Sequence, residues 1–167
     1  MSEPPGFARF YSAELRPVLS FLYKQGASWD DCWDAAQEAF FEALRNWHKI
    51  DSPRAWVRTT ALRYHVHQRQ RRDDDKQRAI AAGWWAPRPP FAEIRIKGDE
   101  ARILAAIAAL PERQREVIAW RADGYPPVEI AHLLGLSEEA VRSSLYQARK
   151  RLKSELSDEP DGGCHER

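Results

Sequence analysis

Residues 110–153 read LPERQREVIAWRADGYPPVEIAHLLGLSEEAVRSSLYQARKRLK. The periodicity of this segment is more informative about the fold than that of any other part of the chain. Two helical patterns meet here at a short turn around Gly135. Ser137 is suited to cap the second helix, because its hydroxyl can accept a hydrogen bond from an otherwise unpaired backbone N–H. The buried stripe of that helix is predicted at Val141, Leu145, Ala148 and Leu152. A short helix, a glycine turn and a second amphipathic helix are typical of a helix-turn-helix.

The outward face of the second helix carries basic and hydrogen-bonding side chains. From Ala140 to Ser154 there are five basic residues and no acid. When such a helix enters the DNA major groove, its early residues reach base edges and its later residues reach phosphates. A basic face that is merely solvated is the plain alternative. The candidate contacts to duplex DNA are Arg142, Ser143, Ser144, Tyr146, Gln147, Arg149 and Lys150.

Within this set, side-chain chemistry suggests separate roles. Arg142 could pair with a guanine edge, and Gln147 could read adenine or contact phosphate. Arg149 and Lys150 are better suited to phosphates, which position a protein on DNA without reporting its sequence.

Composition and charge narrow the class of protein. The 167 residues suffice for one domain or two small ones, and a net charge of +1 indicates no partner by itself. Charge is uneven, however, with six Arg and no acid in residues 54–72. No run approaches the roughly 18 apolar residues of a membrane span, and the N-terminus lacks signal-peptide features. A cytoplasmic protein without membrane insertion is therefore expected.

Catalytic and metal sites are not expected. Cys32 and Cys164 do not make a disulfide framework, and Cys164 with His165 supplies too few ligands for zinc. The sequence has no paired carboxylates, activated nucleophile or phosphate-binding loop at a useful spacing. It therefore favours a protein that is not an enzyme and needs neither metal nor cofactor.

Residues 29–47 form the strongest amphipathic pattern of the N-terminal half. Phe41 lies off the apolar stripe, where an aromatic ring could anchor a protein partner. Packing of Phe41 on a neighbouring helix of the same domain is equally open. The apolar stripe itself is predicted at Trp33, Ala36, Phe40, Leu44 and Trp47.

Residues 53–72 predict a helix with Ser52 as its cap and Pro53 at its first position. A continuous basic stripe is expected at Arg54, Arg58, His65, Arg69 and Arg72. Basic residues interleaved with aromatic ones suit single-stranded nucleic acid, because cations follow the phosphates while rings stack on bases. A solvated arginine face is the alternative, although its charges would repel one another without a bound anion. The candidate contacts are Trp56, Arg58, Arg63, Tyr64, His65, Arg69 and Arg72.

Several of these stretches resemble the bacterial extracytoplasmic-function (ECF) sigma factors of the sigma-70 family. LPERQREVIAW and EIAHLLGLSEEAVRSSLYQARKRL are similar to their C-terminal, fourth-region domain. DAAQEAFFEALRNW is similar to the second-region helix that docks on core RNA polymerase, and SPRAWVRTTALRYHVHQRQRR to the region that melts and reads the downstream promoter element. Departures are also present, since Ser144 and Gln147 stand where that family frequently has basic residues.

Residue patterns and resemblance together predict an all-α fold of two small helical domains joined by a flexible linker, with the helix-turn-helix in the second. The expected division is residues 1–73 for polymerase docking and the downstream element, 74–98 for the linker, 99–156 for the upstream element, and 157–167 for a polar tail. The resemblance implies that core polymerase is docked by Asp34, Gln37, Glu38, Phe41 and Arg45.

The resemblance implies an ECF-type sigma factor that binds core RNA polymerase and directs promoter recognition, DNA melting and transcription initiation at the bacterial nucleoid. Its implied partners are core RNA polymerase and promoter DNA, both duplex and melted, and many family members are also held inactive by an anti-sigma protein. A stand-alone helix-turn-helix regulator is the alternative, which leaves the basic and aromatic helix unexplained. In the linker, Trp84, Trp85 and Phe91 would either clasp the two domains together or contact a large partner.

Overall fold

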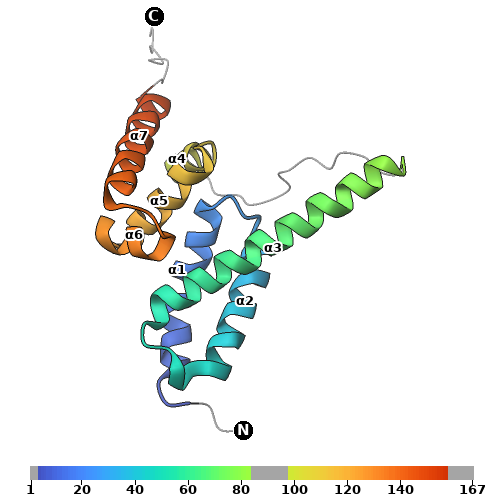
Figure 1. Ribbon diagram of the computed structural model, residues 1–167, viewed down its shortest axis with the longest axis vertical. Helices are drawn as coiled ribbons and strands as arrows, with labels where there is room; N and C mark the ends of the chain where they lie inside the picture. The colour runs from blue at the N-terminus through green and yellow to red at the C-terminus, as the bar shows by residue number, and fades with distance from the viewer. Residues whose placement is uncertain (1–3, 84–97, 158–167) are drawn as a thin grey trace, which may run out of the picture. The chain divides into compact units, whose positions relative to one another are not determined.

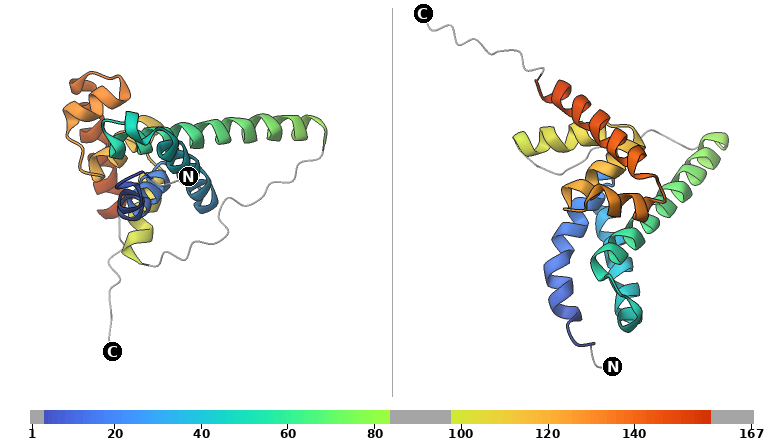
Figure 2. Two further views of the ribbon diagram at one scale, coloured as in Figure 1. Left: turned by 90° about the horizontal axis from the view of Figure 1, so that it is seen from below. Right: turned by 60° about the vertical axis from the view of Figure 1, so that its left-hand side comes forward.

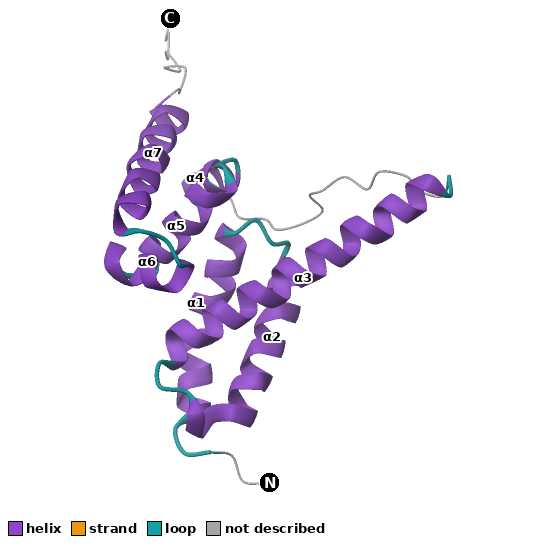
Figure 3. Cartoon of the chain, in the orientation of Figure 1, coloured by secondary structure: helices purple, strands orange, loops and turns teal. Residues whose placement is uncertain are grey.

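The computed structural model describes residues 4–83 and 98–157, which form helices joined by loops, with no strand among them (Figure 3). The chain divides into two compact units, residues 1–95 and 96–167. The predicted all-α fold with two helical domains is therefore confirmed. The linker aromatics Trp84, Trp85 and Phe91, and Cys164 in the tail, lie outside the described residues.

The N-terminal unit contains α1 (Phe7–Lys24), α2 (Trp29–Asn46), a 3-10 turn (Trp47–Lys49) and α3 (Pro53–Ala81). The helix α3 packs across both α1 and α2 (Figure 1). Ser28 caps α2, because its hydroxyl accepts a hydrogen bond from the Asp31 amide over 3.2 Å. Ser52 was expected to cap α3 in the same way, but its side chain makes no cap hydrogen bond and the helix begins at Pro53.

An aromatic cluster closes one end of the α1–α2 pair. The ring of Trp47 lies 5.0 Å from that of Phe10 and 5.2 Å from that of Phe7, between centroids. Tyr11 meets Phe40 edge to face at 4.9 Å. Such contacts between rings add to the burial of the rings themselves. They fix α2, and the side chains on its outer face, relative to α1.

The helix α3 is longer than predicted, because it continues past Arg72 to Ala81. Its last turns project beyond α1 and α2 (Figure 1). The segment DDDKQRAIA contains no Gly or Pro, and Arg78 pairs with Asp75 one turn earlier at 3.0 Å. Such pairs support an exposed helix. The first residue that favours an end is Gly83, with φ of 72°.

The C-terminal unit contains α4 (Asp99–Ala108), α5 (Glu112–Ala122), α6 (Pro127–Leu134) and α7 (Glu138–Ser157). Gly135 ends α6 with φ of 64°, a left-handed conformation that glycine adopts without steric cost. The chain changes direction at this turn, and α7 packs against α4, α5 and α6 (Figure 2). The buried side chains at the centre are Val117, Trp120, Ile130, Val141, Leu145 and Ala148. The predicted helix-turn-helix is therefore confirmed.

Three further observations concern the reactivity of a cysteine, metal binding and membrane spans. Burial raises the pKa of the Cys32 thiol to about 12, with a smaller effect from the Asp31 carboxylate, so this thiol is unreactive at neutral pH. Residues 4–83 and 98–157 contain no group of His, Cys, Asp and Glu suited to a metal ion. Among the same residues, no helix has the length and apolar character needed to cross a membrane.

Candidate nucleic-acid interface

The helix α7 presents the predicted polar face on the surface of the C-terminal unit. Ser137 caps it as expected, because its Oγ accepts from the Ala140 amide over 3.1 Å. Val141, Leu145 and Ala148 are buried on the opposite side. All the candidate contacts to duplex DNA are exposed except Ser144, which is half-buried. The full set of candidates is Arg142, Ser143, Ser144, Tyr146, Gln147, Arg149 and Lys150.

Two of these side chains are held by neighbours within the unit. Arg142 pairs with Glu138 one turn earlier, with 3.0 Å between Nε and Oε1. Gln147 accepts a hydrogen bond at Oε1 from Nε2 of Gln114, on α5, over 3.0 Å. Neither partner was anticipated from the sequence, although the Glu138–Arg142 spacing is that of a helical ion pair.

The predicted basic stripe of α3 is wrong at Arg58 and His65. The Arg58 side chain has no exposed surface, and the guanidinium lies 2.9 Å from the carboxylate of Glu14 on α1. His65 is also buried. Both were candidate contacts to melted DNA, but side chains enclosed by α3 and its neighbouring helices cannot reach a nucleic acid. They belong to the packing of the unit.

Acidic residues from the other two helices pair with arginines on this side of α3. Glu14 forms ion pairs with Arg54 as well as with Arg58, with 3.0 Å to the Nε of Arg54. Asp31 on α2 pairs in the same way with Arg72. Arg54, Arg58 and Arg72 therefore lie along the side of α3 that meets α1 and α2, where carboxylates balance their charge. The pattern within α3 alone does not reveal these partners.

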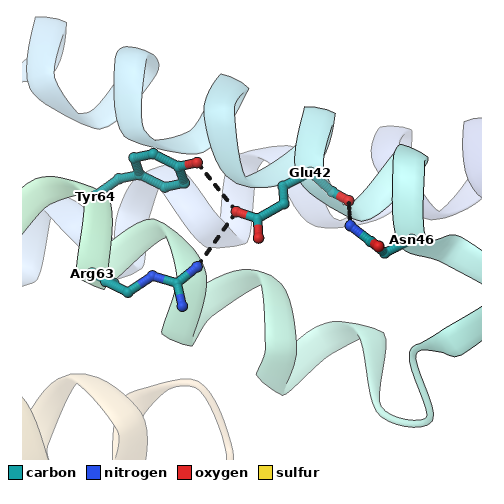
Figure 4. A network of polar contacts seen from close by, with 4 residues as sticks. All are labelled: Glu42, Asn46, Arg63 and Tyr64. Carbon is teal, nitrogen blue, oxygen red and sulfur yellow. Dashed lines mark hydrogen bonds and ion pairs between the residues drawn. The ribbon is translucent and has the colours of Figure 1, made fainter.

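The outward side of α3 carries a different set of polar groups. Glu42 on α2 accepts from the hydroxyl of Tyr64 over 3.2 Å and pairs with Nη2 of Arg63 over 3.4 Å (Figure 4). The same carboxylate therefore holds both candidate contacts on one edge of α3. Burial raises the pKa of Tyr64, and the hydrogen bond that Tyr64 donates to Glu42 and the charge of Glu42 add to that increase.

These groups line an open pocket between α2 and α3. It has a volume of about 680 Å³, and its lining is completed by Glu38, Phe41, Arg45, Asn46 and His67. Further along α3, Arg69 is exposed, while Trp56 near its start is half-buried. Arg63, Arg69 and Arg72 are therefore exposed, Arg63 and Arg72 each being paired with a carboxylate, and Tyr64 is half-buried.

The candidate docking residues form one exposed face of α2. Phe41 is 58% exposed, which is unusual for a large aromatic side chain, and so it is not part of the core of the unit. The guanidinium carbon of Arg45 lies 5.6 Å from the centre of the Phe41 ring. Gln37 donates to the hydroxyl of Tyr11 over 3.3 Å. All five candidate docking residues are exposed, namely Asp34, Gln37, Glu38, Phe41 and Arg45.

Two protein-family models match this chain, one in each of its two compact units. Residues 10–74 match sigma-70 region 2, and residues 100–152 match sigma-70 region 4. The chain belongs to the sigma-70 family. The region 2 match covers most of the α1–α3 unit, and the region 4 match covers the helix-turn-helix.

Individual relatives place this sigma-70 family chain in the ECF group. It is 33% identical to the probable RNA polymerase sigma factor RfaY of Xanthomonas campestris over 74% of this chain and 33% of RfaY. It is 27% identical to the ECF RNA polymerase sigma factor SigJ of Mycobacterium tuberculosis over 93% of this chain and 54% of SigJ. The chain therefore spans about a third and about half of the lengths of these two curated relatives.

A solved structure has the same fold. The sigma factor RpoE of Bartonella quintana, crystallised in complex with the anti-sigma factor NepR, aligns with a TM-score of 0.76 and 19% sequence identity. The alignment covers 94% of this sigma-70 family chain and all of that chain. At this level of identity the likeness concerns the fold.

Proposed function

We propose that this chain is a dissociable promoter-specificity subunit of bacterial RNA polymerase, which binds the core enzyme and directs promoter recognition, melting and initiation. The observation that carries the proposal is the presence of both sigma-70 matches in one chain, region 2 at residues 10–74 and region 4 at residues 100–152. It works by binding and has no active site of its own. It acts in the cytoplasm, at the nucleoid.

In this proposal the exposed face of α2 docks on core polymerase. Phe41 supplies an aromatic anchor, and the charged and amide groups around it form a polar rim. Interfaces commonly draw most of their energy from a few such anchors, surrounded by contacts that exclude water. The aromatic cluster behind α2 keeps this face in place.

The outward side of α3 holds the separated DNA strand. Arg63 and Arg69 supply charge for its phosphates, and Tyr64 supplies a ring on which a base can stack. Arg72 can contribute where its pair with Asp31 opens, and half-buried Trp56 is the fifth candidate on the helix. Arg58 and His65 support this surface from within the fold.

The helix α7 reads the upstream element as duplex DNA. Exposed Ser143, Arg142 and Gln147, with half-buried Ser144, face base edges, and Arg149 and Lys150 contact phosphates. Because the two DNA-binding surfaces lie in one chain, binding of one raises the effective concentration of the other. Each contact can therefore be weak while the pair is selective.

An anti-sigma protein is a further partner in the proposal. It is supported by the solved structure of the Bartonella quintana sigma factor, which was crystallised with the anti-sigma factor NepR. A stand-alone regulator that uses only the helix-turn-helix is disfavoured, because it gives no role to the region 2 match.

Run-off transcription with purified core polymerase tests the proposal. A promoter library is transcribed with and without the protein, and discrete new start sites are expected only when it is present. The matched control is Phe41→Ala, which should reduce all new starts together by weakening docking. Arg142→Ala should instead change which promoters are used. If no starts appear while the protein alone shifts a specific duplex, the stand-alone regulator replaces the proposal.

A further inference from the structure

Gln114 connects the interior of the C-terminal unit to the proposed reading face of α7. Its side chain is only 6% exposed, and it lies where α5 packs on α7. Its Nε2 donates to Oε1 of Gln147 over 3.0 Å. Gln147 is exposed and follows Ser143 by one helical turn, so the two share a face. A buried residue therefore holds a residue that is accessible to DNA.

This contact determines which half of the Gln147 amide remains available. A glutamine side chain carries an oxygen with two accepting lone pairs and a nitrogen with two hydrogens, so a contact that fixes the direction of the oxygen also fixes where the nitrogen points. Because the oxygen of Gln147 accepts from Gln114, the nitrogen and its hydrogens remain for an external acceptor. In its present state the exposed end of Gln147 is chiefly a donor.

The burial of Gln114 favours this orientation over its reverse. In the observed arrangement the Gln114 oxygen is buried without a hydrogen-bond partner among the described residues. The reverse arrangement would satisfy that oxygen, but it would deprive the buried Gln114 amide nitrogen of its acceptor. Buried N–H groups without a partner are rarer in proteins than under-satisfied carbonyl oxygens. Gln114 is therefore better suited to donate than to accept.

We propose that Gln114 is a positioning residue that holds the Gln147 oxygen towards α5 and leaves the amide N–H groups outward, and thereby selects guanine over adenine in the upstream element. Guanine offers two acceptors in the major groove, N7 and O6, whereas adenine offers one acceptor, N7, beside its N6 donor. Reading adenine with two hydrogen bonds requires the amide to donate to N7 while it accepts from N6. With its oxygen held by Gln114, Gln147 is poorly placed for the second of these bonds. The inference rests on the proposed function, because it requires α7 in the groove, and it replaces the expectation that Gln147 reads adenine.

The test uses the full chain with core polymerase and promoters in which each upstream position carries all four bases in turn. Gln147→Ala first identifies the base pair that Gln147 reads, as the position where base preference disappears. Gln114→Met then removes the donor while nearly keeping side-chain length. At that position alone, the preference for guanine over adenine is expected to fall by about fivefold or more, because the released Gln147 can pair with adenine through two hydrogen bonds.

Two further variants separate positioning from a structural role. Gln114→Met introduced together with Gln147→Ala should change no base preference beyond the effect of Gln147→Ala, since the two residues would act through one contact. Gln114→Glu offers an acceptor, so it should turn the Gln147 oxygen outward and shift preference towards bases with an exocyclic amino donor. It also provides a second test should the Met variant fold poorly, and melting temperatures are measured alongside.

The outcomes distinguish the inference from the function on which it rests. A uniform loss of transcription across all bases in both Gln114 variants, with unchanged preferences, would mean that Gln114 only packs, and would overturn the inference alone. Absence of any promoter-dependent initiation by the unmodified protein would overturn the proposed function and the inference with it.

Discussion

Arg58 of α3 and Glu14 of α1 form an ion pair inside the N-terminal unit, with 2.9 Å between Nη1 and Oε2. Arg58 has no exposed side-chain surface, and it also donates to the backbone oxygen of Arg54 over 3.0 Å. A buried charge is tolerated only when it is paired and hydrogen-bonded. The pair therefore ties α1 to α3 and requires both members.

Replacing Glu14 by Gln should destabilise the N-terminal unit by about 3 kcal/mol, because Arg58 would keep its charge without a carboxylate. Arg58→Met should cost less, because Arg54 still pairs with Glu14 and an apolar chain fills the space. Hydrogen exchange of peptides from α1 and α3 measures the change, with peptides from α7 as an internal reference. Arg69→Gln, on an exposed site, should stay within about 0.5 kcal/mol of the original protein. Equal protection of α1 in the Glu14→Gln protein would show that the pair contributes little.

The sequence predicted a helix face correctly where the pattern within that helix decides it, but not where the interacting residues come from other helices. The faces of α7 followed from its own periodicity, since Val141, Leu145 and Ala148 recur at helical spacing and are buried. The same reasoning failed for α3, whose arginines on one side are neutralised by Glu14 and Asp31 from other helices. Distant charges that balance a basic face leave no trace in its local spacing.

The sequence offered a clue to some of these contacts and not to others. For the pair between Arg58 and Glu14 a clue was present, because Glu14 lies within the apolar pattern of α1, where a carboxylate needs a partner. The roles of Glu42 and Gln114 had no such clue, since each depends on a contact between helices. The length of α3 could have been predicted, because DDDKQRAIA has neither Gly nor Pro.

Phe40 and Phe41 are adjacent on α2 but should respond to substitution in opposite ways. Phe40 is 2% exposed, so Phe40→Ala should cost roughly 3–5 kcal/mol of stability by leaving a cavity. Phe41 is mostly exposed, so Phe41→Ala should leave the melting temperature nearly unchanged. It should instead weaken binding to core polymerase by about 2 kcal/mol, as loss of an interface anchor does. Competition for core polymerase against labelled protein measures this effect, and unchanged affinity of Phe41→Ala would remove α2 from the docking surface.

Leu145 and Arg142 offer the corresponding comparison on α7. Leu145→Ala should cost roughly 2–5 kcal/mol, because its side chain is buried against the rest of the unit. Arg142→Ala gives up an exposed pair with Glu138, which is worth only about 0.2–0.5 kcal/mol to stability. It should nevertheless weaken recognition of the upstream element by about 1–3 kcal/mol. Thermal unfolding and promoter titrations measure the two effects. Equal melting losses in the two variants would mean that the faces of α7 are misassigned.

The contact between Glu42 and Tyr64 predicts a change with pH. The pKa of Tyr64 lies above its usual value of 10.0 because of burial first and the Glu42 hydrogen bond and charge second. Since the folded-state pKa is raised, the stabilisation is fully present below the ordinary tyrosine pKa and is lost as pH rises through the raised value. Glu42→Gln removes the charge, so the pKa of Tyr64 should fall towards its ordinary value.

Tyrosinate absorbance measured against pH tests this relationship. The chain has five tyrosines, so Tyr64 is isolated by subtracting the titration of a Tyr64→Phe protein from that of the original. The same subtraction is made in the Glu42→Gln background, where the midpoint assigned to Tyr64 should be lower. Asp34→Asn, on the same helix but outside the groups that shift Tyr64, should leave that midpoint unchanged. If Glu42→Gln and Asp34→Asn gave the same midpoint, Glu42 would not be holding Tyr64, and the arrangement of that edge of α3 would need another cause.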